Sequence, residues 1–212
     1  MINETVKEKL GGLHSAKSLM ASFNFAEIEA LQHQGRWDEA TQVMVAAGQS
    51  LERGGADFVL ICSNTMHKMA DAVQEALSIP LLHIADATAA VIRAKGIERV
   101  GLLGTRFTME EAFYRGRLGD RFGLQVMLPE ESDRQIVHQV IYSELCLGIV
   151  NPTSRQEYQR IIQSLVHQGA EAVILGCTEI MLLVQPDQSE IPLFDTTAIH
   201  ARTAVEWALS HE

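Results

Sequence analysis

One apolar segment occurs twice in this chain of 212 residues. Residues 57–63 read Asp-Phe-Val-Leu-Ile-Cys-Ser, and residues 171–177 read Glu-Ala-Val-Ile-Leu-Gly-Cys. The two copies align without a gap at an offset of 114 residues, and the match extends upstream to Ser50-Leu51 and Ser164-Leu165. Each copy ends in a nucleophilic side chain. The repeat therefore predicts two related halves within one chain.

Both copies are continuously apolar and follow a helical pattern, which is typical of a parallel strand buried on both faces. In open α/β sheets, ligands bind at the carboxyl edge, beside the amino termini of the following helices. We therefore predict an α/β fold of two pseudo-symmetric lobes, residues 1–96 and 97–212. Each lobe is expected to be a parallel sheet flanked by helices, with the active site in the cleft between the lobes.

The rest of the sequence alternates between strand and helix patterns. The expected strands lie near residues 14–23, 57–63, 80–84, 100–105, 124–128, 171–177 and 192–194. The first expected helix covers 27–51 with a break at Gly35, and a second follows Cys62 and ends at about residue 77. The others lie within 87–95, 107–121, 130–147 and 153–168, and from 198 onward. The counterpart of the 100–105 strand would fall before residue 1. The first lobe is thus expected to lack an opening strand, and the isolated chain to be weakly active.

Composition limits the classes of partner and compartment. The formal charge of −10 gives no electrostatic footprint for nucleic acid or an anionic membrane. No apolar run approaches the length of a membrane helix or a signal segment, so a cytoplasmic protein is expected. Three cysteines without Cys-x-x-Cys spacing predict free thiols rather than disulfides or a zinc site. Gly101 and Gly104 lack the third glycine of a dinucleotide fingerprint.

Four stretches carry a family resemblance. Residues 62–67 (Cys-Ser-Asn-Thr-Met-His) and 176–180 (Gly-Cys-Thr-Glu-Ile) resemble the two signatures of the aspartate/glutamate racemase superfamily, and residues 141–145 and 194–200 resemble its amino-acid racemase branch. The resemblance covers nearly the whole chain. It implies a two-lobed fold and cofactor-independent racemisation, with one acid/base residue in each lobe. Two departures are visible: the opening strand with its glycine-methionine-serine loop is absent, and Ser63 stands between the cysteine and asparagine of the first signature.

Racemisation requires a base on one face of the α-carbon and an acid on the other. Cys177 is the better base, because a thiol with a pKa of about 8.5 can be brought toward neutrality by a helix amino terminus. The ungapped repeat pairs Ser63 with Cys177, so Ser63 is expected to face the cleft while Cys62 points into packing. A gap or bulge would restore Cys62 to that position. A free cysteine in an apolar run is otherwise a core residue, which is our reading of Cys146.

The substrate-binding candidates are Asn64, Thr65, Thr178 and Thr105. Their side chains, and the backbone N–H groups after Asn64 and Thr178, are suited to stabilise a carboxylate and the developing carbanion. Asn64 and Thr65 are equally suited to cap the following helix. His67 and His200 have two readings, proton relay and satisfied structural histidine.

The function predicted from these residues is racemisation of an acidic amino acid, aspartate or glutamate, without pyridoxal phosphate, another cofactor or a metal. The expected partner is the small amino-acid substrate, with neither nucleic acid nor membrane, and the expected assembly is a homodimer. Two alternatives stay open at this point. One is a decarboxylase or cis-trans isomerase of small dicarboxylates, and the other is a catalytically silent ligand-binding or scaffold protein.

Overall fold

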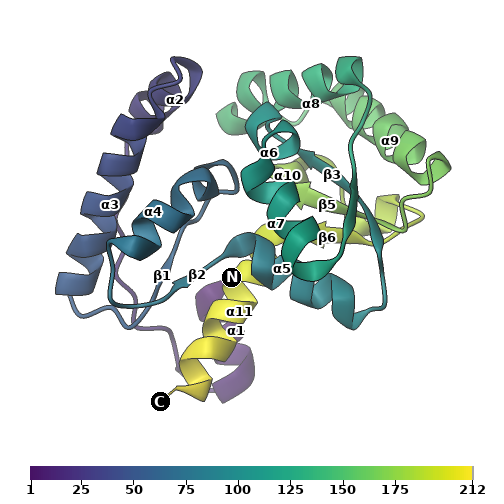
Figure 1. Cartoon of the computed structure of the whole chain (residues 1–212). Coiled ribbons are helices and arrows are strands. Elements are labelled where there is room, and N and C mark those ends of the chain that lie inside the picture. The colour runs from purple at the N-terminus through teal and green to yellow at the C-terminus, as the bar shows by residue number, and fades with distance from the viewer. Residues whose placement is uncertain (212) are drawn as a thin grey trace.

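The computed structural model describes residues 1–211, without the side chain of residue 188. It is an α/β fold with parallel sheets flanked by helices, as the sequence predicts (Figure 1). The strands are β1 (Val59–Leu60), β2 (Leu81–Leu82), β3 (Arg99–Gly104), β4 (Gln125–Met127), β5 (Ala172–Gly176) and β6 (Leu193–Asp195). The α-helices are α1 (Ile2–Leu10), α2 (Phe25–His33), α3 (Trp37–Arg53), α4 (Ala70–Glu75), α5 (Ile84–Ala94), α6 (Arg106–Glu110), α7 (Ala112–Phe122), α8 (Glu131–Ser143), α9 (Pro152–His167), α10 (Ile180–Leu183) and α11 (Thr196–Ser210). Short 3-10 helices are η1 (Thr65–Met69), η2 (Leu145–Leu147) and η3 (Pro186–Gln188).

Two separate parallel sheets organise the chain. The larger sheet has four strands in the order β4-β3-β5-β6, and the smaller one pairs β1 with β2. All five residues of β5 are buried, because β3 and β6 flank this apolar strand. Gly104 is in register with Gly176 at the carboxyl ends of β3 and β5. The residues that follow these two strands therefore emerge side by side.

The internal repeat is visible in the hydrogen bonds of the two sheets. The Val59 N–H donates to the Pro80 carbonyl at 2.9 Å, and the Val173 N–H donates to the Pro192 carbonyl at 3.0 Å. Val59 is paired with Leu81 just as Val173 is paired with Leu193. The β1-β2 pair is thus a shorter copy of the β5-β6 pair.

The turn before each of these strands is repeated as well. It contains a glycine with a left-handed backbone, Gly55 with φ 90° and Gly169 with φ 104°. The next N–H closes the turn in both copies, since Ala56 donates to Leu51 at 3.1 Å and Ala170 donates to Leu165 at 2.9 Å. A side chain at either glycine would strain the turn, so the Gly-Ala pair has a structural role in both copies.

Two hydrophobic cores accompany the two sheets. The smaller one joins α3, β1, η1 and α4 through residues such as Val59, Met66 and Val73. The larger one surrounds β3 and β5 and also includes Ile84 and Ile92 of α5. The predicted boundary at residues 96 and 97 stays a prediction, while the two cores divide the chain earlier, between Leu77 and Ile84.

Helix α1 lies away from the smaller sheet. It packs against α11 in the lower part of Figure 1, so the first and last helices of the chain lie side by side. Lys9 and Glu206 form an ion pair of 3.5 Å between these helices. Within the described residues, none of the helices combines the length and the apolar character that crossing a membrane requires.

Two expected elements differ from the structure. The strand expected near residues 14–23 is wrong, because this segment has no regular structure and is mostly exposed, with Met20 at 86%. Strand-forming residues need a partner strand, and β1 is paired with β2 alone. The helix expected over 107–121 is divided at Glu111, whose extended backbone separates α6 from α7.

Candidate active site

The carboxyl edges of the two sheets face each other through a cluster of hydroxyl groups. Thr65, in η1 after β1, has its Oγ1 2.8 Å from the Oγ1 of Thr105 and 3.3 Å from that of Thr108. Asn64 Nδ2 donates to Thr196 Oγ1 at 3.0 Å. Thr105 follows β3 and Thr196 follows β6, so these bonds place the Cys62–Ser63 turn opposite the edge that carries Cys177.

Cys177 directly follows β5 and is 9% exposed. Its Sγ–H donates to Glu179 Oε2 at 3.0 Å. Burial raises the pKa of the Cys177 thiol well above its ordinary value, and the negative charge of Glu179 raises it further. The resting group at neutral pH is therefore a protonated thiol beside a carboxylate that can accept its proton.

The backbone before Cys177 is closely packed. A Cβ atom on Gly104 would lie 2.7 Å from the carbonyl oxygen of Gly176, and a Cβ atom on Gly176 would lie 2.9 Å from that of Leu103. Both positions therefore require glycine. The close approach of β3 and β5 fixes the position of the Cys177 backbone at the sheet edge.

Cys62 is exposed, so the expectation that it points into packing is wrong. In the repeat Cys62 corresponds to Gly176, which β3 and β6 enclose, whereas β1 has a neighbour on one side. Partial burial of the Cys62 thiol still raises its pKa. Strand pairing also ends at Leu60, so the alternation of a strand does not determine the direction of Cys62 and Ser63.

Ser63 is half-buried and lies two residues before the 3-10 helix η1. Its Oγ accepts a hydrogen bond from the Met66 N–H at 3.4 Å. The corresponding bond in the other copy runs from the Ile180 N–H to the Cys177 carbonyl at 3.3 Å. The N–H group at the same position of the turn is thus bound by the side chain of Ser63 in one copy and by the backbone carbonyl of Cys177 in the other.

The substrate-binding candidates lie at the same edge, but they differ in how many hydrogen bonds their side chains already make. Thr65 and Thr105 are buried and bonded to each other. Asn64 is buried, and its Oδ1 has no partner within the described residues. Asn64 makes no capping bond to η1, so the capping reading is wrong for its side chain. Thr178 is half-buried, and its hydroxyl makes no hydrogen bond in the part of the chain that the structure describes.

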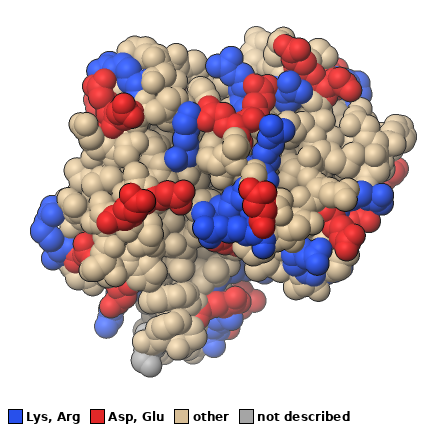
Figure 2. All heavy atoms as spheres, in the orientation of Figure 1, with Lys and Arg blue, Asp and Glu red and all other residues tan. Residues whose placement is uncertain are grey.

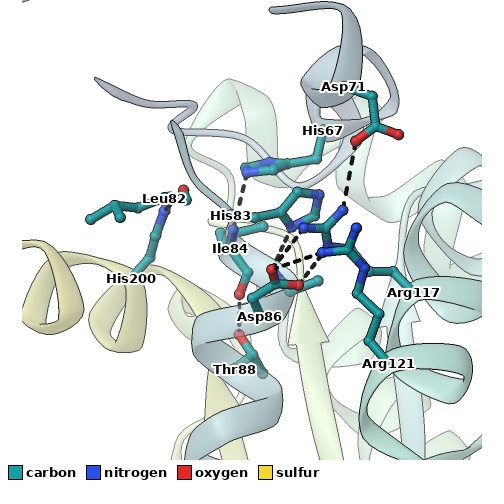
Figure 3. A network of polar contacts seen from close by, with 11 residues as sticks. His67, Asp71, Leu82, His83, Ile84, Asp86, Thr88, Arg117, Arg121 and His200 are labelled. Atoms are coloured by element: carbon teal, nitrogen blue, oxygen red, sulfur yellow. Dashed lines mark hydrogen bonds and ion pairs between the residues drawn. The ribbon is translucent and has the colours of Figure 1, made fainter. Parts of the chain in front are cut away.

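Three buried histidines, His67 of η1 together with His83 and His200, lie close together, as Figure 3 shows. His67 donates from Nδ1 to the Ser63 carbonyl at 2.7 Å and accepts from the Ile84 N–H at Nε2, at 3.1 Å. His200 Nε2 donates to the Leu82 carbonyl at 2.7 Å. Both ring nitrogens of His67 are thus occupied by backbone groups, which identifies His67 as a structural support of the Ser63 turn rather than a proton relay.

His83 caps α5, since its Nδ1 accepts from the Ala85 N–H at 3.2 Å. Burial and then the charge of Arg117 lower the pKa of His83 to about 3. Arg117 forms two short hydrogen bonds to Asp86, of 2.5 and 2.7 Å. Arg121 joins this network and lines, with His83 and Arg117, a shallow hollow of about 240 Å³ on the outer surface (Figure 3). The hollow is separate from Cys177.

Ion pairs also cross between the part that carries the smaller sheet and the part that carries the larger one. Lys68 of η1 lies 2.6 Å from Glu111, and Arg117 of α7 lies 3.7 Å from Asp71. Figure 2 shows acidic and basic side chains interspersed on this face. Within residues 1–211, no group of three His, Cys, Asp or Glu side chains has an arrangement that could hold a metal ion. The absence of a cofactor stays a prediction.

Sequence reasoning missed the role of Glu179. The signal was available, because the carboxylate stands two residues after Cys177 in the second signature. The roles of Thr108 and Thr196 could not be predicted from a local sequence pattern. Their contacts to Thr65 and Asn64 join residues that are 43 and 132 positions apart.

Comparisons with known proteins identify the family of this chain. The sequence matches the Asp/Glu/Hydantoin racemase family over residues 1–204. It is 30% identical to the broad specificity amino-acid racemase RacX of Bacillus subtilis over 178 residues, which are 82% of this chain and 75% of that protein.

Two solved structures are similar over nearly the whole chain. A candidate Asp/Glu racemase from Yersinia pestis is 52% identical with a TM-score of 0.91, and the match covers 98% of this chain and 90% of that one. An aspartate racemase homologue from Pyrococcus horikoshii OT3 is 31% identical with a TM-score of 0.83, covering 97% and 89%. The amino-acid racemases among these relatives are isomerases. The chain belongs to the Asp/Glu/Hydantoin racemase family.

Proposed function

We propose that this protein racemises an acidic amino acid, aspartate or glutamate, by removing the α-proton on one face and returning a proton on the other. The observation that carries this proposal is the contact between the two sheet edges. The hydrogen bonds of Thr65 to Thr105 and of Asn64 to Thr196 hold the Ser63 turn opposite the edge of Cys177. One acid/base candidate is thereby available from each side.

Cys177 acts first when its face of the α-carbon carries the proton. Glu179 accepts the thiol proton along the existing 3.0 Å hydrogen bond, which leaves a thiolate at Cys177. The thiolate then removes the α-proton, so that the C–H bond breaks and an S–H bond forms. The raised pKa of Cys177 makes the thiolate a strong base once it is formed.

Ser63 supplies the second proton. Its hydroxyl is a poor base but an adequate donor to a carbanion, so the O–H bond breaks as a new C–H bond forms on the opposite face. The proton held by Glu179 returns to Ser63 through water, which balances the cycle. Free enantiomers have equal energies, so the kcat/KM values for the L-to-D and D-to-L reactions must be equal. This holds even though a different group removes the proton in each direction. Cys62, the exposed neighbour, is the alternative donor.

The site also needs groups that hold the substrate. Asn64 Oδ1, buried and without a partner among the described residues, is a suitable acceptor for the substrate ammonium group. The Thr178 hydroxyl and the backbone N–H groups after Cys177 are suitable donors to the α-carboxylate, where charge develops as the proton leaves. Pyridoxal phosphate and metal have no part in these steps.

The experiment is exchange of the α-hydrogen of L-aspartate and L-glutamate in deuterated water, followed by NMR and by chiral chromatography. Wild type should exchange and racemise at least one of them, Cys177→Ala should do neither, and Cys177→Ser should keep traces. Cys146→Ala is the matched control, because Cys146 is half-buried and lies on η2 rather than at the strand end. Exchange by Cys177→Ala at the wild-type rate would remove Cys177 from the mechanism.

We also propose that the protein works in the cytoplasm as a homodimer. The three cysteines are free thiols in the structure, which suits a reducing compartment. Fractionation of cells with an antibody against the chain tests the compartment. Sedimentation equilibrium of the purified protein tests the dimer, and a monomer at assay concentration would contradict it.

A further inference from the structure

Arg106 lies at the active edge of the larger sheet. It follows Thr105, which comes directly after the register pair of Gly104 and Gly176. Neighbouring strands lie about 5 Å apart, and consecutive Cα atoms about 3.8 Å apart. Arg106, two residues beyond Gly104, and Cys177, one residue beyond Gly176, therefore leave the sheet at the same edge, with Cα atoms at most about 16 Å apart.

The guanidinium group of Arg106 lies beside the aromatic rings through which α2 and α8 contact each other. Its Cζ atom lies 5.5 Å from the ring centre of Phe107, and its backbone N–H donates to His138 Nδ1 at 3.2 Å. Phe107 and His138 in turn contact His33 of α2, with ring centres 6.2 and 6.1 Å apart. Arg106 thus lies where helices of the two halves meet above the sheet edge.

Tyr142 of α8 connects this position to Cys177. Burial raises the pKa of the Tyr142 phenol, the negative charge of a Cys177 thiolate raises it as well, and the positive charge of Arg106 lowers it. Tyr142 therefore lies within electrostatic range of both groups. Its hydroxyl donates to Gln32 Oε1 of α2 at 2.9 Å, so a hydrogen bond also joins α2 and α8.

Arg106 is exposed and forms no ion pair with any described residue, unlike other cations nearby. Lys68, three residues after Thr65, pairs with Glu111 at 2.6 Å. Arg155, on the helix that contacts α10, donates through Nε to the Leu183 carbonyl at 2.7 Å. Near Cys177 the charged neighbour is the acidic Glu179. Among these described cations, Arg106 is the one whose side chain has no hydrogen-bond or ion-pair partner, so it is available to a ligand.

We propose that Arg106 determines specificity for acidic amino acids by binding the side-chain carboxylate of the substrate. The assignment rests on the proposed racemase function and deepens it. With the α-carbon between Cys177 and Ser63, the carboxylate of aspartate or glutamate extends toward α6 and meets the guanidinium group. A guanidinium-carboxylate contact is charge-assisted and can be bidentate, so it distinguishes a carboxylate from the amide of the same shape.

The test compares two pairs of isosteric substrates, glutamate with glutamine and aspartate with asparagine, in wild type, Arg106→Gln and Arg106→Lys. For Arg106→Gln, we expect kcat/KM on the acidic substrates to fall about 10- to 100-fold, mainly through a higher KM, while the amides are unaffected. Arg106→Lys should be intermediate. Arg115→Gln is the matched control, since Arg115 is an exposed arginine of the next helix without an ion pair among the described residues.

The outcomes are distinguishable. An equal loss on acids and amides, or no loss on either, with a circular dichroism spectrum like that of wild type, would overturn the role of Arg106. If wild type exchanges the α-hydrogen of none of the four amino acids, the proposed function itself fails, and the assignment of Arg106 fails with it.

Discussion

Cys177 follows a five-residue strand with neighbours on both sides, whereas Cys62 and Ser63 follow a two-residue strand with a neighbour on one side. The two sites descend from one sequence pattern and share their turns and first hydrogen bonds. They differ in what surrounds the strand end. Strand pairing on both sides makes the Cys177 position rigid and forces glycine before it, while the other end is held by η1 and its histidine support.

The chemistry of the two ends differs in the same way. The Cys177 thiol has its own proton acceptor, Glu179, at hydrogen-bond distance. Ser63 has a backbone N–H donor from Met66 and no carboxylate partner among the residues that the structure describes. A base-forming group on one side and a proton-donating group on the other are therefore expected from the geometry. The comparison teaches that a repeated fold can hold unlike groups at equivalent positions.

The strongest test of this comparison replaces each of the two acid/base candidates after β1 by alanine in turn. Ser63→Ala should reduce racemisation by about 1,000-fold or more, because the proton donor on that face is lost, while some exchange of one enantiomer with retention persists. Cys62→Ala should remain within about twofold of wild type, since an exposed side chain is removed. Initial rates from both enantiomers measure this.

The reverse pattern, an inactive Cys62→Ala protein beside an active Ser63→Ala protein, would show that the enzyme uses two thiols. Ser63→Cys sharpens the result. It should preserve activity and make the maximal rates of the two directions more alike.

A smaller effect is expected at the partner of Cys177. Glu179→Gln removes the acceptor of the thiol proton, so kcat should fall about 10- to 100-fold at pH 7.5. The same change removes a charge that raises the pKa of Cys177, so the rise of kcat/KM with pH should shift to lower pH. Glu130→Gln, an exposed change at the start of α8, is the control. A pH profile identical to that of wild type would separate Glu179 from the thiol.

The difference in packing predicts a difference in stability. Gly176→Ala would place a Cβ atom 2.9 Å from the Leu103 carbonyl oxygen and should lower the free energy of unfolding by about 1–3 kcal/mol. Cys62→Ala, at the equivalent position of the other copy, should change it by about 0.5 kcal/mol or less. Urea unfolding followed by circular dichroism measures both. Equal losses would mean that the two strand ends are packed alike.

The smallest expected effect concerns the three buried histidines. The pKa of His83 is lowered from 6.5 to about 3, mainly by burial, so below pH 6.5 the unfolded chain binds a proton that the folded chain does not. Stability should therefore decrease as the pH falls from about 6.5 toward 3. His83→Asn keeps the cap of α5 without a titrating ring and should weaken this pH dependence. Melting temperatures at pH 7.5 and 5.5 measure it, with His14→Asn, an exposed histidine, as control.

Much of the fold is visible in the sequence because buried parallel strands are continuous apolar runs. The repeat predicts the shared turns, and the break at Gly35 separates α2 from α3 as expected. The segment near residues 14–23 shows the limit of such patterns. Its composition suits a strand, but a strand also requires a partner that no local pattern reveals.

The site shows the same limit. Cys177, Ser63 and Asn64 are visible as side chains at the ends of apolar runs, and the structure brings the turn of Ser63 and Asn64 to the edge of Cys177. The exposure of Cys62 was not visible, since it follows from the number of strands beside β1. The partner of Asn64, Thr196, lies 132 residues away. Their contact depends on how the two halves of the chain pack together, which no local pattern predicts.

The exposure of Cys62 affects how the thiols of this protein can be assayed. An alkylating reagent will reach Cys62 before the buried Cys177, so a count of fast-reacting thiols reports the first and not the second. Inactivation by such a reagent can arise from the bulk added to Cys62 beside the Ser63 turn. Labelling is therefore informative in a background that carries both Cys62→Ala and Cys146→Ala, where the remaining thiol is Cys177 and substrate protection against its modification can be measured.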